Sequence, residues 1–159
     1  MVIEDYDPAW PALFEILRGM LAEALGETAV AIEHIGSTAV PGLAAKPIID
    51  IDVVIRSLDL PLAIDKLAAF GYVHAGDQGI PGREAFKQNG AWPAHHLYVC
   101  PEAGAELRRH LAFRDLLRSS HEVRQAYEEL KKRLAHTYRN DRLAYTEAKS
   151  AFILDRVNV

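Results

Sequence analysis

The first apolar pattern along the chain is helical. It begins after Asp7 and Pro8, which together predict a helix cap and a first-turn proline, and it stops at Gly26. The apolar positions between these signals fall three or four residues apart, as on one face of a helix: Trp10, Leu13, Leu17, Met20 and Ala24. The pattern therefore predicts an amphipathic helix near the N-terminus.

Helical spacing returns in two later parts of the chain. Residues 61–70 predict a second helix, which ends at Gly71. From Glu102 onward the pattern is helical nearly to the end, with breaks predicted near Ser119–Ser120 and near Asn140. The C-terminal third is therefore predicted to contain three helices.

Strand patterns lie between the helical ones. Residues 29–35 are short and apolar, and "KPIIDIDVVI" at 46–55 is dense in the branched side chains that strands favour, which predicts a central strand. Residues 72–73 and "HHLYVC" at 95–100 predict two more strands, and "EAFK" at 84–87 could form a strand of a hairpin. The order α-β-β-α-β-β-α-α-α predicts an α/β protein of the α+β type, with a small mixed sheet covered by helices.

Composition narrows the class of protein. With 159 residues, half of them apolar, the chain has the size of one domain spanning 1–159. A net charge of -4 and a pI near 6.0 argue against a protein held to nucleic acid mainly by phosphate neutralisation. A single cysteine, Cys100, and the lack of an apolar N-terminal signal segment favour a cytoplasmic location, and no apolar stretch is long enough to span a bilayer.

Two acids interrupt the most apolar strand. Side chains alternate faces along a strand, so Asp50 and Asp52 point the same way, with Cα atoms about 6 to 7 Å apart. Two carboxylates at that spacing repel each other and can both reach one divalent cation, and their hard oxygens favour Mg²⁺ or Mn²⁺. A strand that turns a polar face to solvent would account for the same acids.

The segment "GSTAVPG" precedes this strand. Gly36 allows close approach of the backbone, and Ser37 and Thr38 could cap a following short helix whose free N–H groups favour a phosphate. Donors for terminal phosphates, followed by paired acids on a strand, are what a metal-assisted phosphoryl or nucleotidyl transfer site needs. Taken alone, a Gly-Ser turn usually only reverses the chain.

The block "HIGSTAVPGLAAKPIIDIDVVI" resembles the signature of the GrpB-like (UPF0157) family. Further segments resemble family landmarks over almost the whole chain: "YDPAWPALF", "GY", "GREAF", "FRDLLR", "YEELK" and "YTEAKSAFI". The resemblance implies the nucleotidyltransferase superfamily with a polymerase-β-like core. Its pattern of glycine-serine followed by an acid-x-acid pair falls on Gly36, Ser37, Asp50 and Asp52.

The third acidic position of that superfamily differs in this chain. Polymerase-β-like enzymes generally carry a third carboxylate on a neighbouring strand, where this sequence offers His96, and Tyr98 stands where the family usually has a second histidine. A neutral imidazole at His96 could complete a metal shell or assist proton transfer, or it could simply be hydrogen-bonded beside the sheet. Glu84 is an alternative acid that we rank below His96.

Basic residues are the candidates for phosphate contacts. Lys46 precedes the acid-bearing strand, and Arg83 follows a glycine and could clamp a phosphate with two parallel hydrogen bonds. Lys149, at helical spacing from Tyr145, and Lys131 match family landmarks, so some of these C-terminal residues could line a pocket while others tie the helices to the sheet. Solvated lysines would explain the same positions.

The function implied is a Mg²⁺- or Mn²⁺-dependent nucleotidyltransferase. Asp50 and Asp52 would hold the metal ion against a nucleoside triphosphate, and Gly36 with Ser37 would steady its β and γ phosphates while a small-molecule or protein hydroxyl attacks the α-phosphorus. An inactive nucleotide-binding or accessory module is the alternative, because the third acid is missing and GrpB-like segments are also found fused to dephospho-CoA kinases. A metal-dependent phosphohydrolase would use the same residues with water as acceptor.

Overall fold

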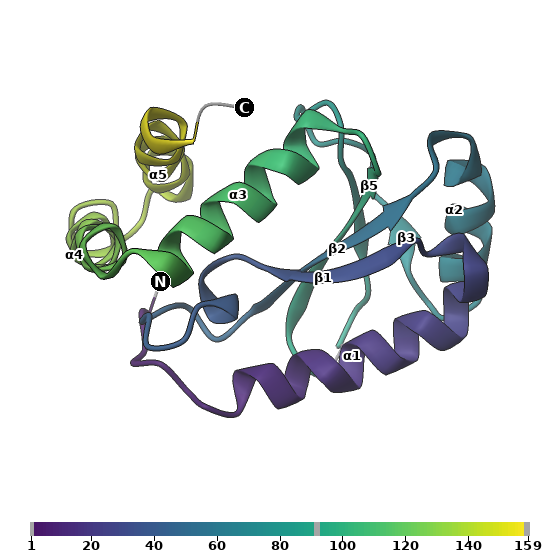
Figure 1. The fold of residues 1–159 in the computed structure, drawn as a ribbon, viewed down its shortest axis with the longest axis horizontal. Coiled ribbons are helices and arrows are strands. Elements are labelled where there is room, and N and C mark those ends of the chain that lie inside the picture. Colours follow the sequence, from purple (N-terminus) through teal and green to yellow (C-terminus); the bar gives the residue numbers. More distant parts are fainter. Residues whose placement is uncertain (1, 91–92, 158–159) are drawn as a thin grey trace.

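The computed structural model describes residues 2–90 and 93–157, and its centre is a five-stranded mixed sheet (Figure 1). The strand order is β1-β2-β5-β4-β3, where β2 and β5 are parallel and all other neighbours are antiparallel. The strands are β1 (Ala31–Ile35), β2 (Ile49–Ile55), β3 (Val73–His74), β4 (Glu84–Lys87) and β5 (His95–Pro101). The "EAFK" segment is therefore a full member of the sheet, which the predicted element order lacked.

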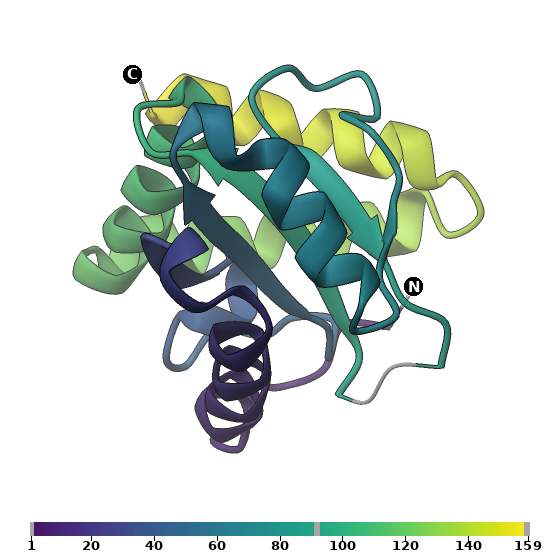
Figure 2. The same ribbon diagram turned by 90° about the vertical axis from the view of Figure 1, so that its right-hand side faces the viewer.

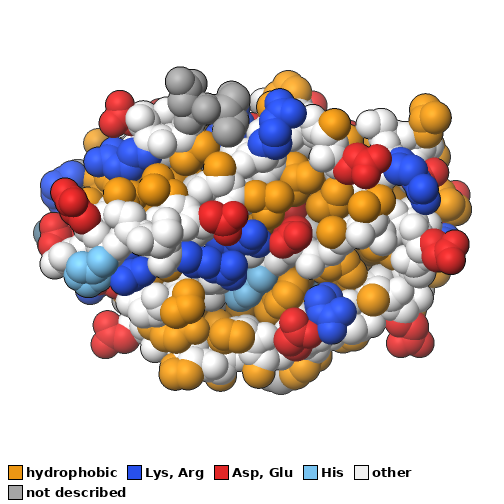
Figure 3. Space-filling model, in the orientation of Figure 1, with side chains coloured by type: hydrophobic (Ala, Val, Ile, Leu, Met, Phe, Trp, Pro, Cys, Tyr) orange, Lys and Arg blue, Asp and Glu red, His pale blue; other side chains and the backbone are white. Residues whose placement is uncertain are grey.

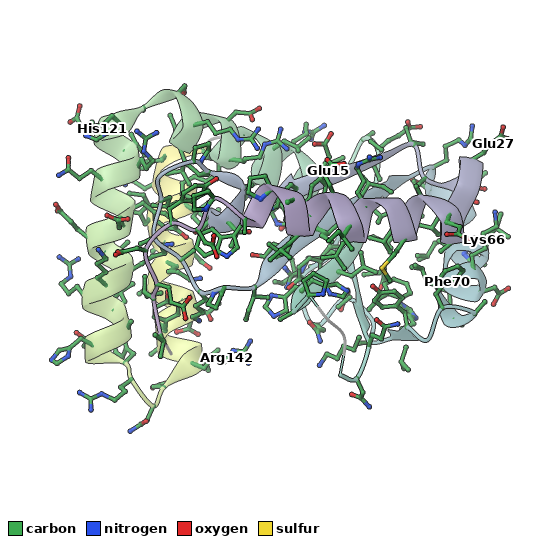
Figure 4. The ribbon with its side chains drawn as sticks, turned by 90° about the horizontal axis from the view of Figure 1, so that it is seen from below. Glu15, Glu27, Lys66, Phe70, His121 and Arg142 are labelled. Carbon is green, nitrogen blue, oxygen red and sulfur yellow. The ribbon has the colours of Figure 1, made fainter. Side chains whose placement is uncertain are left out.

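Helices cover both faces of this sheet. Figure 2 shows α2 (Leu60–Ala68) on the near side of the strands, and α1 (Trp10–Leu25) lies on the same face. On the other face α3 (Ala105–Ser119) crosses the strands, and α4 (His121–Thr137) and α5 (Arg142–Arg156) form an antiparallel pair beside it (Figures 1 and 4). None of the helices formed by the described residues is long and apolar enough to cross a membrane.

The start of α1 differs from the sequence prediction. The Asp7 carboxylate accepts a hydrogen bond from the Ala9 N–H at 2.8 Å, which forms a turn before the helix instead of capping it. The helix begins at Trp10, so the first-turn proline is Pro11 rather than Pro8. The predicted end is confirmed, because Gly26 follows the helix with a positive φ of 54° that glycine adopts without strain.

The alternation of β2 divides its side chains between the two faces. Its isoleucine and valine side chains at odd positions enter the main core under α1 and α2: Ile49, Ile51, Val53 and Ile55. Leu97 and Val99 of β5 continue this apolar surface. The even positions face α3, and the acids lie there.

A second apolar cluster holds the C-terminal helices to residues 40–43. It is formed by Val40, Leu43, Phe113, Leu117, Tyr127 and Val157. Arginines on α3 add polar ties to the same region, because Arg118 Nε donates to the Ala39 carbonyl at 2.9 Å and Arg114 donates to Glu33 at 2.9 Å. The loop before β2 is thus packed between the sheet and the helical pair.

The main core predicts a strong contrast between two leucines. Leu67 in α2 is fully buried, whereas the Leu58 side chain is 94% exposed. Replacing Leu67 by alanine removes buried methyl groups and leaves a cavity, so we expect a loss of about 2 to 5 kcal/mol in the free energy of unfolding. Leu58→Ala is the control, with an expected change within about 0.5 kcal/mol. Urea unfolding of both variants measures the difference, and equal losses would contradict this packing.

Candidate functional site

The register of β2 and β5 brings the two acids opposite two aromatic residues. Asp50 pairs with His96, and Asp52 pairs with Tyr98, so all four side chains share the face that α3 crosses. His95 lies on the opposite face, where its Nε2 accepts a hydrogen bond from the Tyr72 hydroxyl at 2.7 Å. Figure 3 shows basic, acidic and histidine side chains gathered at the middle of the α3 face.

Each acid has a histidine partner. His96 Nδ1 donates to Asp50 Oδ1 at 2.9 Å, and His110 Nδ1 from α3 donates to Asp52 Oδ2 at 2.6 Å. The Asp50 side chain is 30% exposed, whereas that of Asp52 is fully buried. Glu106 Oε2 lies 3.4 Å from the other ring nitrogen of His110 and completes a chain of acid, imidazole and acid.

His110 is a site residue that the sequence interpretation missed. The available signal was the spacing of Glu106 and His110, which lie four residues apart on one helical face. Nothing in the sequence, however, indicated that this face would lie over Asp52, because the contact joins residues 58 positions apart.

Gly36 packs directly on the first acid. Its φ is 73°, and a Cβ atom added there would lie 3.1 Å from Asp50 Cβ and Cγ and closer still to the carboxylate oxygen Oδ2. Only glycine permits this approach, in agreement with the role predicted for it. The turn after Gly36 is thereby fixed against the edge of the acid pair.

Ser37 and Thr38 do not cap the short turn that they begin. No side-chain cap bond forms at the 3₁₀ turn Ser37–Ala39, so the predicted capping is wrong. The Thr38 hydroxyl is buried and shares a hydrogen bond of 2.9 Å with Nε2 of His34, whose ring stacks on Phe14. Thr38 therefore anchors the turn and is not presented to a phosphate, whereas Ser37 faces the C-terminal helices.

Lys131 of α4 is the partner of Ser37. Its ammonium donates to Ser37 Oγ at 2.8 Å and to the Ala44 carbonyl at 2.6 Å, and the residue is only 2% exposed. Burial, and next to it the charge of Lys149, lowers the pKa of Lys131 to about 7. The charges of Glu128 and Asp50 act in the opposite direction, and a further anion beside Lys131 would favour its charged form.

Lys46 and Lys149 extend this positive region. Their ammonium groups lie 4.4 and 4.8 Å from the centre of the Tyr145 ring. Burial, and next to it the charge of Lys46, lowers the pKa of Lys149 to about 8, whereas the charge of Asp50 raises it. Burial, and then the charge of Arg142, also lowers the pKa of Lys46. We call Lys46, Lys131 and Lys149 the lysine cluster.

The structure separates Arg83 from this cluster. Its guanidinium carbon lies 4.2 Å from the centre of the ring of Tyr98, the residue that pairs with Asp52. Arg83 is therefore not a neighbour of Ser37. Glu84, the alternative third acid, follows the opposite alternation, pairs with Val99 and contacts His74 at 2.9 Å. It therefore lies on the far face of the sheet from the two aspartates.

Asp50 and Asp52 are two carboxylates that could supply oxygen ligands to a cation. Across the described ranges 2–90 and 93–157, no group of three or more His, Cys, Asp or Glu side chains is arranged to hold a metal ion. Asp52 Oδ1 is buried and has no hydrogen-bond partner among the described residues. Mg²⁺ typically takes one or two protein carboxylates and completes its shell with water and substrate phosphates, so this donor set fits it.

Comparison with known proteins shows relatives over the whole chain. Residues 1–158 match the family described as "GrpB protein". The UPF0157 protein YqkA of Bacillus subtilis is 35% identical over 149 residues, which are 93% of this chain and 43% of that protein. The chain thus spans less than half the length of this relative.

Solved structures show a related fold. The crystal structure of conserved protein GrpB from Enterococcus faecalis superposes with a TM-score of 0.80 at 31% identity and covers 97% of this chain and 98% of that one. The Cid1 poly(U) polymerase, in complex with the UTP analog UMPNPP, gives a TM-score of 0.54 at 16% identity over 84% of this chain and 43% of its own. The predicted α+β, polymerase-β-like fold is confirmed by these likenesses.

The contact at Gly36 predicts an effect that positive φ alone does not cause. Gly42 has a similar φ of 82° but open space around its Cα, so Gly42→Ala measures backbone strain only, about 1 to 2 kcal/mol. Gly36→Ala adds a clash with Asp50, and we expect it to cost a further 1 to 3 kcal/mol or so in the free energy of unfolding. Chemical denaturation compares the two variants. Equal destabilisation would show that the turn does not pack on Asp50.

His34 predicts a pH dependence of stability. Burial, and next to it the charge of Arg118, lowers its pKa from 6.5 to about 4. Between these values the unfolded chain binds a proton that the folded chain does not, so the stability present above pH 6.5 falls as the pH drops and levels off near pH 4. The loss should be roughly 3 kcal/mol. His34→Gln should remove this part of the pH profile in urea unfolding, and identical profiles would contradict it.

Proposed function

The chain belongs to the GrpB family, and we propose that it is a nucleotidyltransferase that moves a nucleoside monophosphate from a nucleoside triphosphate to a hydroxyl acceptor. One observation carries this proposal. Asp50 and Asp52 project from β2 on one face, and the glycine-serine turn packs on the first of them with the lysine cluster beside it. Carboxylates next to a cluster of lysines are suited to a polyphosphate with its cation.

The residues that would hold the cation are Asp50 and Asp52. A bound Mg²⁺ or Mn²⁺ would polarise the α-phosphate and offset its charge. The unpartnered Oδ1 of Asp52 supports this assignment, because a buried carboxylate oxygen without a hydrogen-bond donor is costly unless another positive group faces it.

The chain's own residues have separate tasks in this proposal. The lysine cluster and the Ser37 hydroxyl bind the β and γ phosphates and stabilise the charge that collects on the leaving pyrophosphate. The acceptor oxygen forms a bond to the α-phosphorus as the bond from that phosphorus to pyrophosphate breaks. His96, whose side chain is 41% exposed and hydrogen-bonded to Asp50, would take the proton from the acceptor hydroxyl.

A nucleotide-binding module without transfer activity is the second candidate. Two observations favour it: β5 carries His96 and Tyr98 where the superfamily has its third acid, and the buried Asp52 is already occupied on one side by His110. Such a module would use the same lysine cluster and the same cation ligands. Binding experiments therefore test the site, and turnover experiments decide between the two functions.

The site predicts nucleotide binding that depends on a divalent cation. Calorimetry with ATP, GTP, CTP and UTP, with and without Mg²⁺, should show binding that strengthens when the cation is present. Asp50→Asn removes one ligand charge, and we expect it to weaken this Mg²⁺-dependent binding by about 10-fold or more. Asp155→Asn, at a side chain that is 80% exposed, is the matched control. Asp52→Asn is the second test variant, with circular dichroism to verify its fold.

One result would contradict the nucleotide site, and another would contradict the transfer activity. Equal binding by the wild type and both site variants would show that the acids do not form the nucleotide site. Cation-dependent binding without pyrophosphate release, over a panel of hydroxyl compounds, would favour the binding module.

A further inference from the structure

Arg83 is a half-buried arginine that has no salt bridge to any of the described residues. The side chain that its guanidinium meets is Tyr98, and its Nε is buried without an acceptor among the described residues. A buried donor of a charged group normally has a partner, because leaving it unpaired costs free energy. The guanidinium is nevertheless fixed in place, since it lies over the Tyr98 ring at 4.2 Å.

The position of Arg83 relative to the acids is set by the sheet. It directly precedes β4, in which Ala85 pairs with Tyr98, and Tyr98 in turn pairs with Asp52. Arg83 therefore lies on the face of the acids, two strand spacings or about 10 Å from Asp52. The lysine cluster lies at the other end of the acid pair, where its charges act on Asp50 and Ser37.

The cavity that Arg83 borders does not lie beside the two aspartates. Its lining includes Ile55, Leu60, Glu84 and Val99, which belong to the α1 and α2 side of the sheet, so the ligand considered below does not occupy it. Gly82, which precedes Arg83, has a φ of 91°, and a Cβ atom added there would lie 3.6 Å from Cγ of Glu106 on α3.

We propose that Arg83 binds an anionic group, a phosphate or a carboxylate, of the acceptor. The inference rests on the proposed transfer reaction, in which attacking and leaving oxygens lie on opposite sides of the α-phosphorus. Because the lysine cluster holds the pyrophosphate end, the acceptor enters from the side of Asp52 and Tyr98. The planar guanidinium presents parallel donors that match an oxyanion, and it thereby selects acceptors with a negative charge beside the reacting hydroxyl.

The second arginine near this point does not offer the same free donors. Arg109 also has an Nε without a partner, but its guanidinium forms an ion pair with Glu106 on the same helix. Arg109 therefore has a carboxylate partner, whereas Arg83 has none among the described residues. This contrast makes Arg109→Ala a useful comparison for the role of Arg83.

The test uses the arginine Nε–H signals of the ¹⁵N-labelled full chain. Glycerol 3-phosphate and glycerate are titrated as charged hydroxyl compounds, and glycerol as the neutral control. The Arg83 signal, assigned by its absence in Arg83→Lys, should shift and saturate with at least one of the charged compounds but not with glycerol. Arg83→Ala should weaken binding by about 10- to 100-fold, and Arg83→Lys by less, because lysine keeps the charge without the planar fork. Arg108→Ala, at an exposed neighbour of Arg109, should bind as the wild type does.

The outcomes separate this proposal from the transfer reaction. Unchanged binding in Arg83→Ala, loss of binding in Arg109→Ala instead, or an unmoved Arg83 signal with both anions would overturn it. The titration is repeated with a non-hydrolysable ATP analogue and Mg²⁺, and displacement of the anion by the analogue would also overturn it, because the anion would then occupy the lysine cluster. Failure of the analogue to bind would count against the transferase. The titration with the two anions would still show whether Arg83 binds an anionic group.

Discussion

Two negative charges on the same side of an interior strand are the constraint on which the rest of the molecule depends. Asp50 and Asp52 cannot be moved to solvent without turning the isoleucines and valines of β2 out of the main core, because alternation couples the two faces. The protein therefore compensates them where they lie. His96 and His110 donate to one carboxylate each, and the lysine cluster supplies charge from the other end. Like charges held together in this way are stable only with positive partners, which is the property that a cation and a polyphosphate would use.

The two faces of the sheet carry different kinds of side chain. The α1 and α2 face is a largely apolar core that packs against β2 and β5, which the backbone ladder holds in register. The other face is polar because the helices above it contribute charged side chains at chosen points: Lys131 from α4, Lys149 from α5 and His110 from α3. Arginines at the end of α3 fix that helix to the backbone near Gly36, so the position of one wall of the site depends on the position of the other. A rigid support under a composite polar surface suits a site that has to hold a highly charged ligand in one orientation.

Local patterns in the sequence predicted the features that local geometry determines. The shared face of Asp50 and Asp52 follows from the period of a strand, and the close approach at Gly36 follows from what a residue without Cβ permits. The contacts that link distant parts of the chain could not be predicted in this way. His110 over Asp52 and Lys131 on Ser37 depend on how helices pack across the sheet, and no spacing within the sequence encodes that packing. The same limit explains Thr38, which was predicted to cap a short helix but whose hydroxyl is bound to His34, and Arg83, which lies apart from the lysines.

The bond between Ser37 and Lys131 joins residues 94 positions apart, and this separation fixes an order of events during synthesis. The acid-bearing strand leaves the ribosome long before the helix that supplies its buried counter-charge. Until α4 docks, the nascent sheet has only the histidine partners of its aspartates, His96 from β5 and His110 from α3. The last two helices are thus more than a cover on a finished domain. They supply the lysines whose positive charges lie near Asp50, so a chain that stops before α4 would fold without this compensation.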